Sequence, residues 1–228
     1  MNKSLLSSTY NTRDIGGYMT AAGTPLKKDV IWRSDRIIAP AAEDIALLRE
    51  KNITTVIDLR TAEEVTKNPH GLSDIAGFDY HNLPITEGSR APDSVDAVAE
   101  SYINIAGSAS AGDIFRTISG AEGGVIYNCS AGKDRTGVIT AILHKLCGVS
   151  DEMMIHDYML TKVNCERELR AFAELHPELD VNIIIPREEY ITGFMERFKE
   201  RYGSPADYLR AVGLTYIEIS GITRKLMG

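Results

Sequence analysis

The chain has 228 residues, of which 43% are hydrophobic and 25% are charged, which is typical of a globular protein. Its net charge of −7 argues against the basic surface that binds nucleic acid, so we expect no nucleic-acid partner. The apolar runs are too short for a transmembrane segment or a signal peptide. Three cysteines, Cys129, Cys147 and Cys165, form a sparse and odd set that favours a reducing compartment. We therefore expect a cytoplasmic protein, with secretion open if a leader was removed.

Apolar patterning predicts alternating strands and helices over the first two thirds of the chain. Short runs of β-branched and aromatic residues indicate strands, and apolar residues spaced every three or four indicate helices. The predicted strands cover residues 30–32, 53–59, 78–83 and 125–128. The predicted helices between them cover residues 40–52, 61 to before Pro69, 92–105 and 112–119.

After Val149 the apolar spacing is helical almost throughout. The helix after the last strand is expected to run to about residue 147, and further helices are expected at residues 153–160, 166–175, 187–201, 205–212 and 216–226. Strands that alternate with helices usually pair in parallel. We therefore predict an α/β fold with a mostly parallel central sheet flanked by helices and a helical C-terminal third. No repeat or long linker divides the sequence, so we expect one domain over residues 1–228.

Residues 125–137, VIYNCSAGKDRTG, combine a predicted strand, a short loop of small residues and the start of a predicted helix. In such a unit the loop N–H groups and the helix N-terminus converge on one point, which makes an anion site. Cys129 stands first in the loop, where positive potential favours its thiolate. Arg135 closes the loop, and its planar guanidinium can hold two oxygens of the same anion. A thiolate beneath a bound tetrahedral anion is suited to attack on phosphorus.

The string C-S-A-G-K-D-R-T-G at residues 129–137 resembles the loop of the bacterial cysteine-dependent tyrosine and phosphoinositide phosphatases, H-C-x-A-G-K-D-R-T-G. The likeness continues in the same order along nearly the whole chain. Further similar motifs lie at residues 11–17 (NTRDIGG), 32–34 (WRS), 58–60 (DLR), 202–204 and 208–210. One position departs, because Asn128 stands where that family has His. The resemblance implies a tyrosine-phosphatase-like fold and hydrolysis of phosphomonoesters without a metal or cofactor.

Each residue of this loop has an expected role. Cys129 is expected to form a phosphocysteine intermediate, which divides hydrolysis into two steps, and Arg135 to bind the phosphoryl oxygens. Thr136 can donate its hydroxyl to the Cys129 sulfur, and it can also satisfy backbone groups at the start of the helix. Small residues let the loop amides approach the anion, and these residues are Ser130, Ala131 and Gly132.

The resemblance implies that Asp134, inside the loop, is the general acid. Lys133 and Arg135 beside it favour its ionised form, whereas a bound phosphate dianion favours its protonated form. Two other carboxyl groups are alternatives: Glu87 in a predicted loop, and Asp58 at the end of a predicted strand. A structural role fits Asp58 better.

Lys133 is informative about the substrate. A loop lysine adds a point charge beside the reacting phosphate, as in related phosphatases that act on inositol lipids. The resemblance thus implies dual specificity, for phosphotyrosine with phosphoserine or phosphothreonine, and activity on phosphoinositides. Five polar residues in the other motifs are expected to brace the loop from behind, namely Asn11, Arg13, Asp14, Arg33 and Arg60.

The sequence leaves two alternative functions open. Rhodanese-like and arsenate-reducing proteins also place a cysteine in a short anion loop, but Thr136 and the pair Lys133-Asp134 suit phosphate ester hydrolysis better. The second alternative is a catalytically weak or inactive phosphate-binding module, because Asn128 stands where the similar family has His. The five histidines show no metal-ligand spacing, so we expect no metal site.

Overall fold

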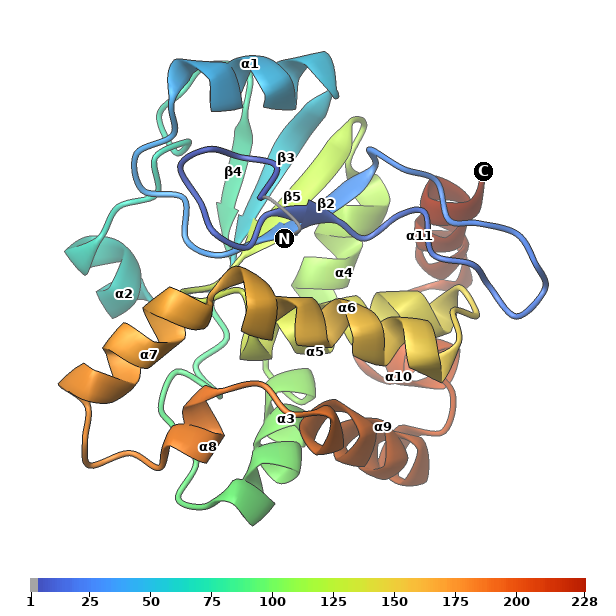
Figure 1. Cartoon of the computed structure of the whole chain (residues 1–228). Helices are drawn as coiled ribbons and strands as arrows, with labels where there is room; N and C mark the ends of the chain where they lie inside the picture. The colour runs from blue at the N-terminus through green and yellow to red at the C-terminus, as the bar shows by residue number, and fades with distance from the viewer. Residues whose placement is uncertain (1–3) are drawn as a thin grey trace.

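Five strands form one sheet in the order β1-β2-β5-β3-β4 in the computed structural model, which describes residues 4–228 (Figure 1). The strands are β1 (Arg13–Asp14), β2 (Ile31–Ser34), β3 (Ile53–Asp58), β4 (Asp79–Asn82) and β5 (Gly124–Asn128). Strand β5 pairs in parallel with β2 and β3, and β3 pairs in parallel with β4. Only β1 is antiparallel to its neighbour. The predicted α/β fold with a mostly parallel sheet is confirmed.

Helices connect the strands and make up the last third of the chain (Figure 1). They are α1 (Ala42–Glu50), α2 (Ala62–Lys67), the short 3-10 helix η1 (Val95–Ala97), α3 (Val98–Ala106), α4 (Ala111–Gly120), α5 (Asp134–Leu146), α6 (Asp151–Asn164), α7 (Glu166–Leu175), α8 (Val181–Ile184), α9 (Glu188–Tyr202), α10 (Pro205–Ala211) and α11 (Tyr216–Met227). Within residues 4–228, none of these helices has the length and apolar character needed to cross a bilayer.

Helix boundaries differ from the prediction where a polar side chain caps the chain. The helix predicted over residues 92–105 begins only after Ser94, whose hydroxyl accepts the backbone N–H of Ala97 and starts η1. Helix α6 begins earlier than predicted because the Ser150 hydroxyl accepts the N–H of Met153. The short helix α8 was not predicted, and the Asp180 side chain caps it. Side-chain oxygens at these positions satisfy N–H groups that have no partner inside the helix.

The central strand β5 buries both of its faces. Val125 and Tyr127 point into the larger hydrophobic core, which includes α3, α4, α5 and α9, and Ile126 points into the smaller core on the α1 side. All three side chains are fully buried, and each such burial contributes about 1.5–3 kcal/mol to stability. Because both faces are covered, the strand is rigid, and it delivers Cys129 to a fixed point at its carboxyl end.

Candidate active site

The loop of residues 129–135, called the anion loop below, joins β5 to α5 at the carboxyl edge of the parallel strands. Cys129 is its first residue and is only 3% exposed. Gly132 has a φ of +64°, and a Cβ there would lie 2.7 Å from the backbone oxygen of Ser34. Glycine is therefore required for the loop to pack this closely on the end of β2. The N-terminus of α5 adds its partial positive charge to this point.

Carbonyl groups of the anion loop are held from behind. The Asn11 Nδ2 donates to the carbonyl oxygens of Ala131 and Gly132, both at 3.1 Å, and Arg33 Nη2 donates to Gly132 O at 2.7 Å. In a trans peptide the N–H points away from the C=O. Fixing these two carbonyls behind the loop therefore turns the amides of Gly132 and Lys133 towards its open side, as an anion cradle requires.

A buried ionic cluster fixes Arg33 in turn. Arg13 Nε and Arg33 Nη1 donate to the two carboxylate oxygens of Asp157 on α6, at 2.8 and 2.5 Å. Burial opposes ionisation of Asp157, but the two guanidinium groups outweigh it and lower the pKa of its carboxyl. Asp157 was not predicted from the sequence, because no local pattern on α6 indicates a contact with residues more than 120 positions away.

The predicted bracing is confirmed for Asn11 and Arg33, whereas Asp14 and Arg60 make other contacts. The Asp14 carboxylate accepts the backbone N–H groups of Gly16 and Asp29, so it stabilises a turn. Arg60 pairs with Asp58 at 2.7 Å and also donates to the backbone of Asn68. The expectation that these two residues brace the anion loop from behind was wrong, because their hydrogen bonds go to other parts of the chain.

Arg135 closes the anion loop and forms a two-bond ion pair with Glu64 of α2. Its Nη1 and Nη2 lie 2.7 and 2.8 Å from the two Glu64 oxygens, and the Ser130 hydroxyl donates to the same carboxylate at 2.5 Å. Burial would raise the pKa of Glu64, but the bonds from Arg135 and Ser130 outweigh it and lower that pKa to about 2. Glu64 also closes the capping box with Thr61, so the start of α2 sets the orientation of the guanidinium.

Lys133 and Asp134 both point towards neighbouring helices. Lys133 Nζ donates to the carbonyl oxygens of Ile183 and Ile184 at the end of α8, both at 2.8 Å. It also lies 3.4 Å from Asp134 Oδ1, which accepts the Tyr102 hydroxyl at 2.5 Å. The ammonium group thus links α8 to the anion loop, a contact that the sequence did not indicate.

A cavity of about 570 Å³ opens above the anion loop. The residues of the loop that line it are Cys129, Ser130, Ala131, Lys133, Asp134 and Arg135. An apolar wall from α7 and α8 and the segment between them faces this polar floor, formed by Leu169, Phe172, Leu179, Ile183 and Ile184. A polar floor beneath an apolar wall can bind an ester of phosphate whose other part is apolar or aromatic.

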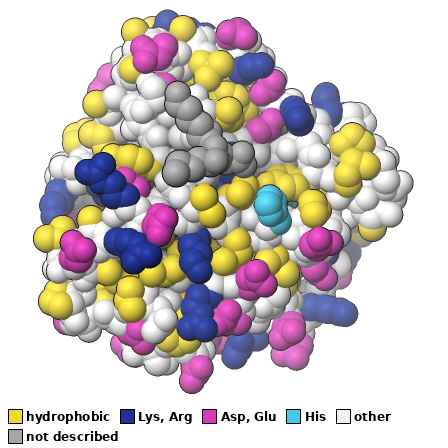
Figure 2. Space-filling model, viewed as in Figure 1, with side chains coloured by type: hydrophobic (Ala, Val, Ile, Leu, Met, Phe, Trp, Pro, Cys, Tyr) yellow, Lys and Arg dark blue, Asp and Glu magenta, His cyan; other side chains and the backbone are white. Residues whose placement is uncertain are grey.

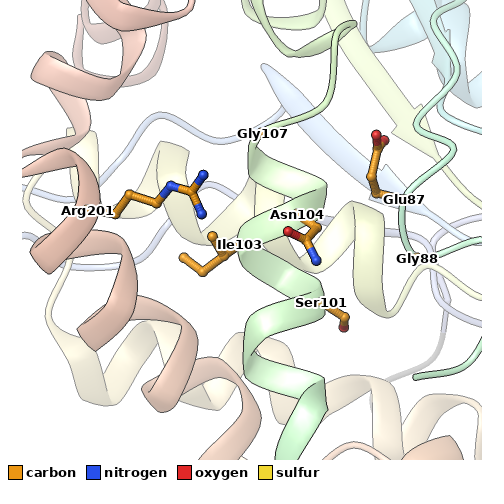
Figure 3. A pocket seen from close by; sticks show the side chains of 7 residues that line it. All are labelled: Glu87, Gly88, Ser101, Ile103, Asn104, Gly107 and Arg201. Atoms are coloured by element: carbon orange, nitrogen blue, oxygen red, sulfur yellow. The ribbon is translucent and has the colours of Figure 1, made fainter. Parts of the chain in front are cut away.

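Glu87, an alternative candidate for the general acid, lies in a neighbouring pocket of about 350 Å³ (Figure 3). It shares this pocket with Asn104 of α3 and Arg201 of α9. Gly88 borders both pockets, but Glu87 does not line the Cys129 cavity, whereas Asp134 does. The other alternative, Asp58, is fully buried in its pair with Arg60.

Asn128, which precedes the cysteine, is held between Asp58 and His70. Its Nδ2 donates to Asp58 Oδ1 at 3.2 Å, and its Oδ1 lies 3.0 Å from His70 Nε2. The His70 Nδ1 accepts the N–H of Leu72, so its Nε2 carries the proton and donates to Asn128. Burial lowers the pKa of His70 to about 4, which keeps the ring neutral. A histidine thus contacts the residue before Cys129, and it comes from a distant part of the sequence.

Thr136 is fully buried at the start of α5. Its hydroxyl has no hydrogen-bond partner among residues 4–228. The bond to the Cys129 sulfur that the sequence suggests therefore stays a prediction. Such a buried, unpaired donor in the residue after Arg135 is available for a group that develops charge during a reaction.

The positive charge for anion binding is local to this site. Acidic and basic side chains are interspersed with apolar ones over the face shown in Figure 2. The three cysteines carry free thiols, and within residues 4–228 no group of three or more His, Cys, Asp or Glu side chains is arranged to hold a metal ion. The anion site is thus built from the loop amides, the α5 N-terminus and Arg135.

Comparison with known proteins identifies the family of the chain. The model of the tyrosine phosphatase family matches residues 5–228, and the chain belongs to this family. Triple specificity protein phosphatase PtpB of Mycobacterium tuberculosis is 25% identical over 98% of this chain and 98% of its own. A tyrosine-protein phosphatase of Nostoc commune is 26% identical over 75% of this chain and 65% of its own. The chain is a phosphatase.

Among solved structures, a crystal structure of TpbA from P. aeruginosa in complex with pTyr is similar to this chain. Its TM-score is 0.42 at 16% sequence identity, and the match covers 82% of this chain and 88% of that one. The catalytic core of Siw14 has a TM-score of 0.39 at 14% identity.

Proposed function

We propose that the chain hydrolyses phosphomonoesters through a phosphocysteine intermediate on Cys129. The carrying observation is the anion loop itself, whose carbonyls are bound from behind by Asn11 and Arg33 while its first residue is a buried cysteine. Amides turned to the open side and the α5 N-terminus favour negative charge there. This arrangement can hold a phosphate group above the Cys129 sulfur.

In the first step the Cys129 thiolate attacks phosphorus, so that a P–S bond forms as the bond to the ester oxygen breaks. Asp134, which lines the cavity, gives its proton to the departing oxygen. Arg135 and the loop amides bind the equatorial oxygens, on which charge shifts in the transition state. In the second step water attacks phosphorus and gives its proton to Asp134, and the thiolate leaves. Thr136 donates its free hydroxyl to the departing sulfur.

We infer phosphotyrosine as a substrate, with phosphoserine, phosphothreonine and phosphoinositides as further ones. The apolar wall of the cavity, to which Phe172 belongs, can pack on an aromatic ring or on the apolar part of a lipid. The name of the M. tuberculosis relative, a triple specificity protein phosphatase, supports a range of phosphate esters.

The test measures phosphate release from para-nitrophenyl phosphate in the presence of a chelator. We expect turnover by the wild-type chain, and loss of turnover with retained phosphate binding in Cys129→Ser, because the cradle does not depend on the sulfur. Turnover of Cys129→Ser within tenfold of wild type would contradict the covalent mechanism. A chelator-sensitive reaction, or binding without turnover in the wild type, would favour another use of the anion loop. Phosphate release from phosphotyrosine peptides and from phosphoinositide vesicles is then compared, which ranks the substrates.

A further inference from the structure

The two carboxyl oxygens of Asp134 have different surroundings. Oδ1 accepts the Tyr102 hydroxyl at 2.5 Å and lies 3.4 Å from Lys133 Nζ. For Oδ2, the part of the chain that the structure describes (residues 4–228) provides no hydrogen bond. The side chain is 31% exposed and lines the Cys129 cavity. Oδ2 is therefore the oxygen that is free to meet a substrate.

Two buried tyrosines hold Oδ1 from behind. Tyr102 of α3 is 1% exposed, and its hydroxyl lies 2.7 Å from that of Tyr158 on α6. Tyr158 is fixed in turn, because its ring packs so closely on α5 that a Cβ at Gly137 would lie 3.2 Å from it. The hydroxyl of Tyr102 is thus positioned by three helices. Tyr102 does not line the cavity and so does not touch a substrate there.

The direction of these hydrogen bonds follows from the protonation of the tyrosines. Burial, together with the negative charge of Asp134, raises the pKa of Tyr102 well above its ordinary value. Tyr102 therefore keeps its proton and donates it to Asp134 Oδ1, while the Tyr158 hydroxyl donates to Tyr102. A hydrogen bond from a neutral donor to a carboxylate stabilises the ionised form.

We propose that Tyr102 is a positioning residue that divides the work between the two oxygens of Asp134. Oδ1 stays an acceptor throughout the reaction, and Oδ2 carries the proton. In the first step the proton passes from Oδ2 to the ester oxygen as the P–O bond breaks. In the second step Oδ2 takes a proton from the attacking water as the P–S bond breaks. This inference rests on the acid role of Asp134 proposed above.

Several groups face Asp134. They are Tyr102 of α3, Lys133 of its own loop and Arg135 of α5, with Tyr158 of α6 behind Tyr102. Tyr102→Phe removes the donor that orients Oδ1 and leaves the two cations in place, so it should slow proton transfer without weakening substrate binding.

The experiment compares Tyr102→Phe with Tyr208→Phe, a matched control. Tyr208 is also fully buried, and its hydroxyl donates to the backbone oxygen of Ala106 at 2.7 Å, away from the cavity. An alkyl phosphate depends on protonation of the leaving oxygen more than para-nitrophenyl phosphate does. General acid catalysis accelerates such a reaction by about 10²–10⁴-fold. We expect Tyr102→Phe to lose part of this acceleration, so that kcat on the alkyl ester falls roughly tenfold. Its kcat on the aryl ester and both KM values should change little.

A double-mutant cycle with Asp134→Asn isolates the coupling. In the Asp134→Asn background, Tyr102→Phe should have no further effect on kcat for the alkyl ester. Equal losses on both esters, or the same loss in both backgrounds, would overturn the proposal. If Asp134→Asn itself shows no dependence on the leaving group, the acid role fails, and that result is distinct from a failure of Tyr102 alone. Should Tyr102→Phe not fold, Tyr158→Phe must show the same asymmetry at smaller size for the proposal to stand.

Discussion

At the scale of single residues, the guanidinium of Arg135 has two tasks. It holds Glu64 with both terminal nitrogens, and we propose that it also holds the phosphoryl oxygens. Only a planar fork with several donors can meet two such partners at once. A lysine in its place would present one point charge, which the Glu64 carboxylate would occupy.

We therefore expect Arg135→Lys to lower kcat/KM on para-nitrophenyl phosphate by about 10²-fold or more, the size of effect seen when a donor to a transition-state oxyanion is lost. Circular dichroism and thermal melting should show a folded chain. Arg116→Lys is the control, because Arg116 pairs with Asp113 on the exposed side of α4. Near-normal kcat/KM in Arg135→Lys would show that this residue does not bind the phosphate.

At the scale of elements, the short helix α8 depends on the anion loop. Lys133 Nζ binds two carbonyls at the C-terminal end of α8, where a cation also meets the negative end of the helix. A helix of four residues is not stable by itself. The apolar wall that α8 contributes to the cavity is thus bound to Lys133 of the anion loop.

Lys133→Ala should loosen this wall. We expect faster amide hydrogen exchange over residues 181–185. The KM for phosphotyrosine peptides should rise more than the inhibition constant of inorganic phosphate, because only the peptides reach the apolar wall. Lys145→Ala is the matched control, because Lys145 Nζ also donates to a backbone carbonyl, that of Val149, but away from the cavity. Unchanged amide hydrogen exchange at α8 in Lys133→Ala would show that Lys133 does not stabilise this helix. A larger loss on phosphoinositides than on phosphotyrosine would assign Lys133 to the inositol head group as well.

Elements could be predicted from sequence where their own residues determine them. Strand β5 follows from its β-branched run, and the helices of the last third follow from their spacing. Strand β1 could not be found, because two residues become a strand only by pairing with β2. The loop residues Cys129 and Arg135 were identifiable from one short segment. The residues that support the site from elsewhere in the chain were not, because each reaches it through a contact between distant parts of the sequence; these residues are Glu64, Asp157, Tyr102 and His70.

At the scale of the whole molecule, buried histidines make stability depend on pH. The pKa of His70 is lowered by burial to about 4, against about 6.5 in an unfolded chain. Between these values the unfolded chain binds more protons than the folded one, so the free energy of unfolding falls as the pH drops from about 6.5 to 4. The contribution is at most about 3 kcal/mol.

We expect the urea midpoint to fall between pH 7 and pH 5 in the wild type and to fall less in His70→Gln, whose amide can donate to Asn128 but does not titrate. The pH dependence that remains in His70→Gln should come from His144, which is also buried and has a lowered pKa. His156→Gln is the control, because His156 is exposed. A pH dependence that is the same in His70→Gln and in the wild type would show that His70 titrates normally.

The contacts of Asn11 connect the N-terminal segment with the anion loop and with helix α6. Its Nδ2 binds the anion loop and also the Thr161 hydroxyl, 150 residues along the chain. During synthesis the N-terminal segment leaves the ribosome first, yet its partners on α6 are made much later. A nascent chain that stops before residue 157 therefore contains Cys129 and Arg135 but lacks the Asp157 carboxylate that fixes Arg33 behind the anion loop.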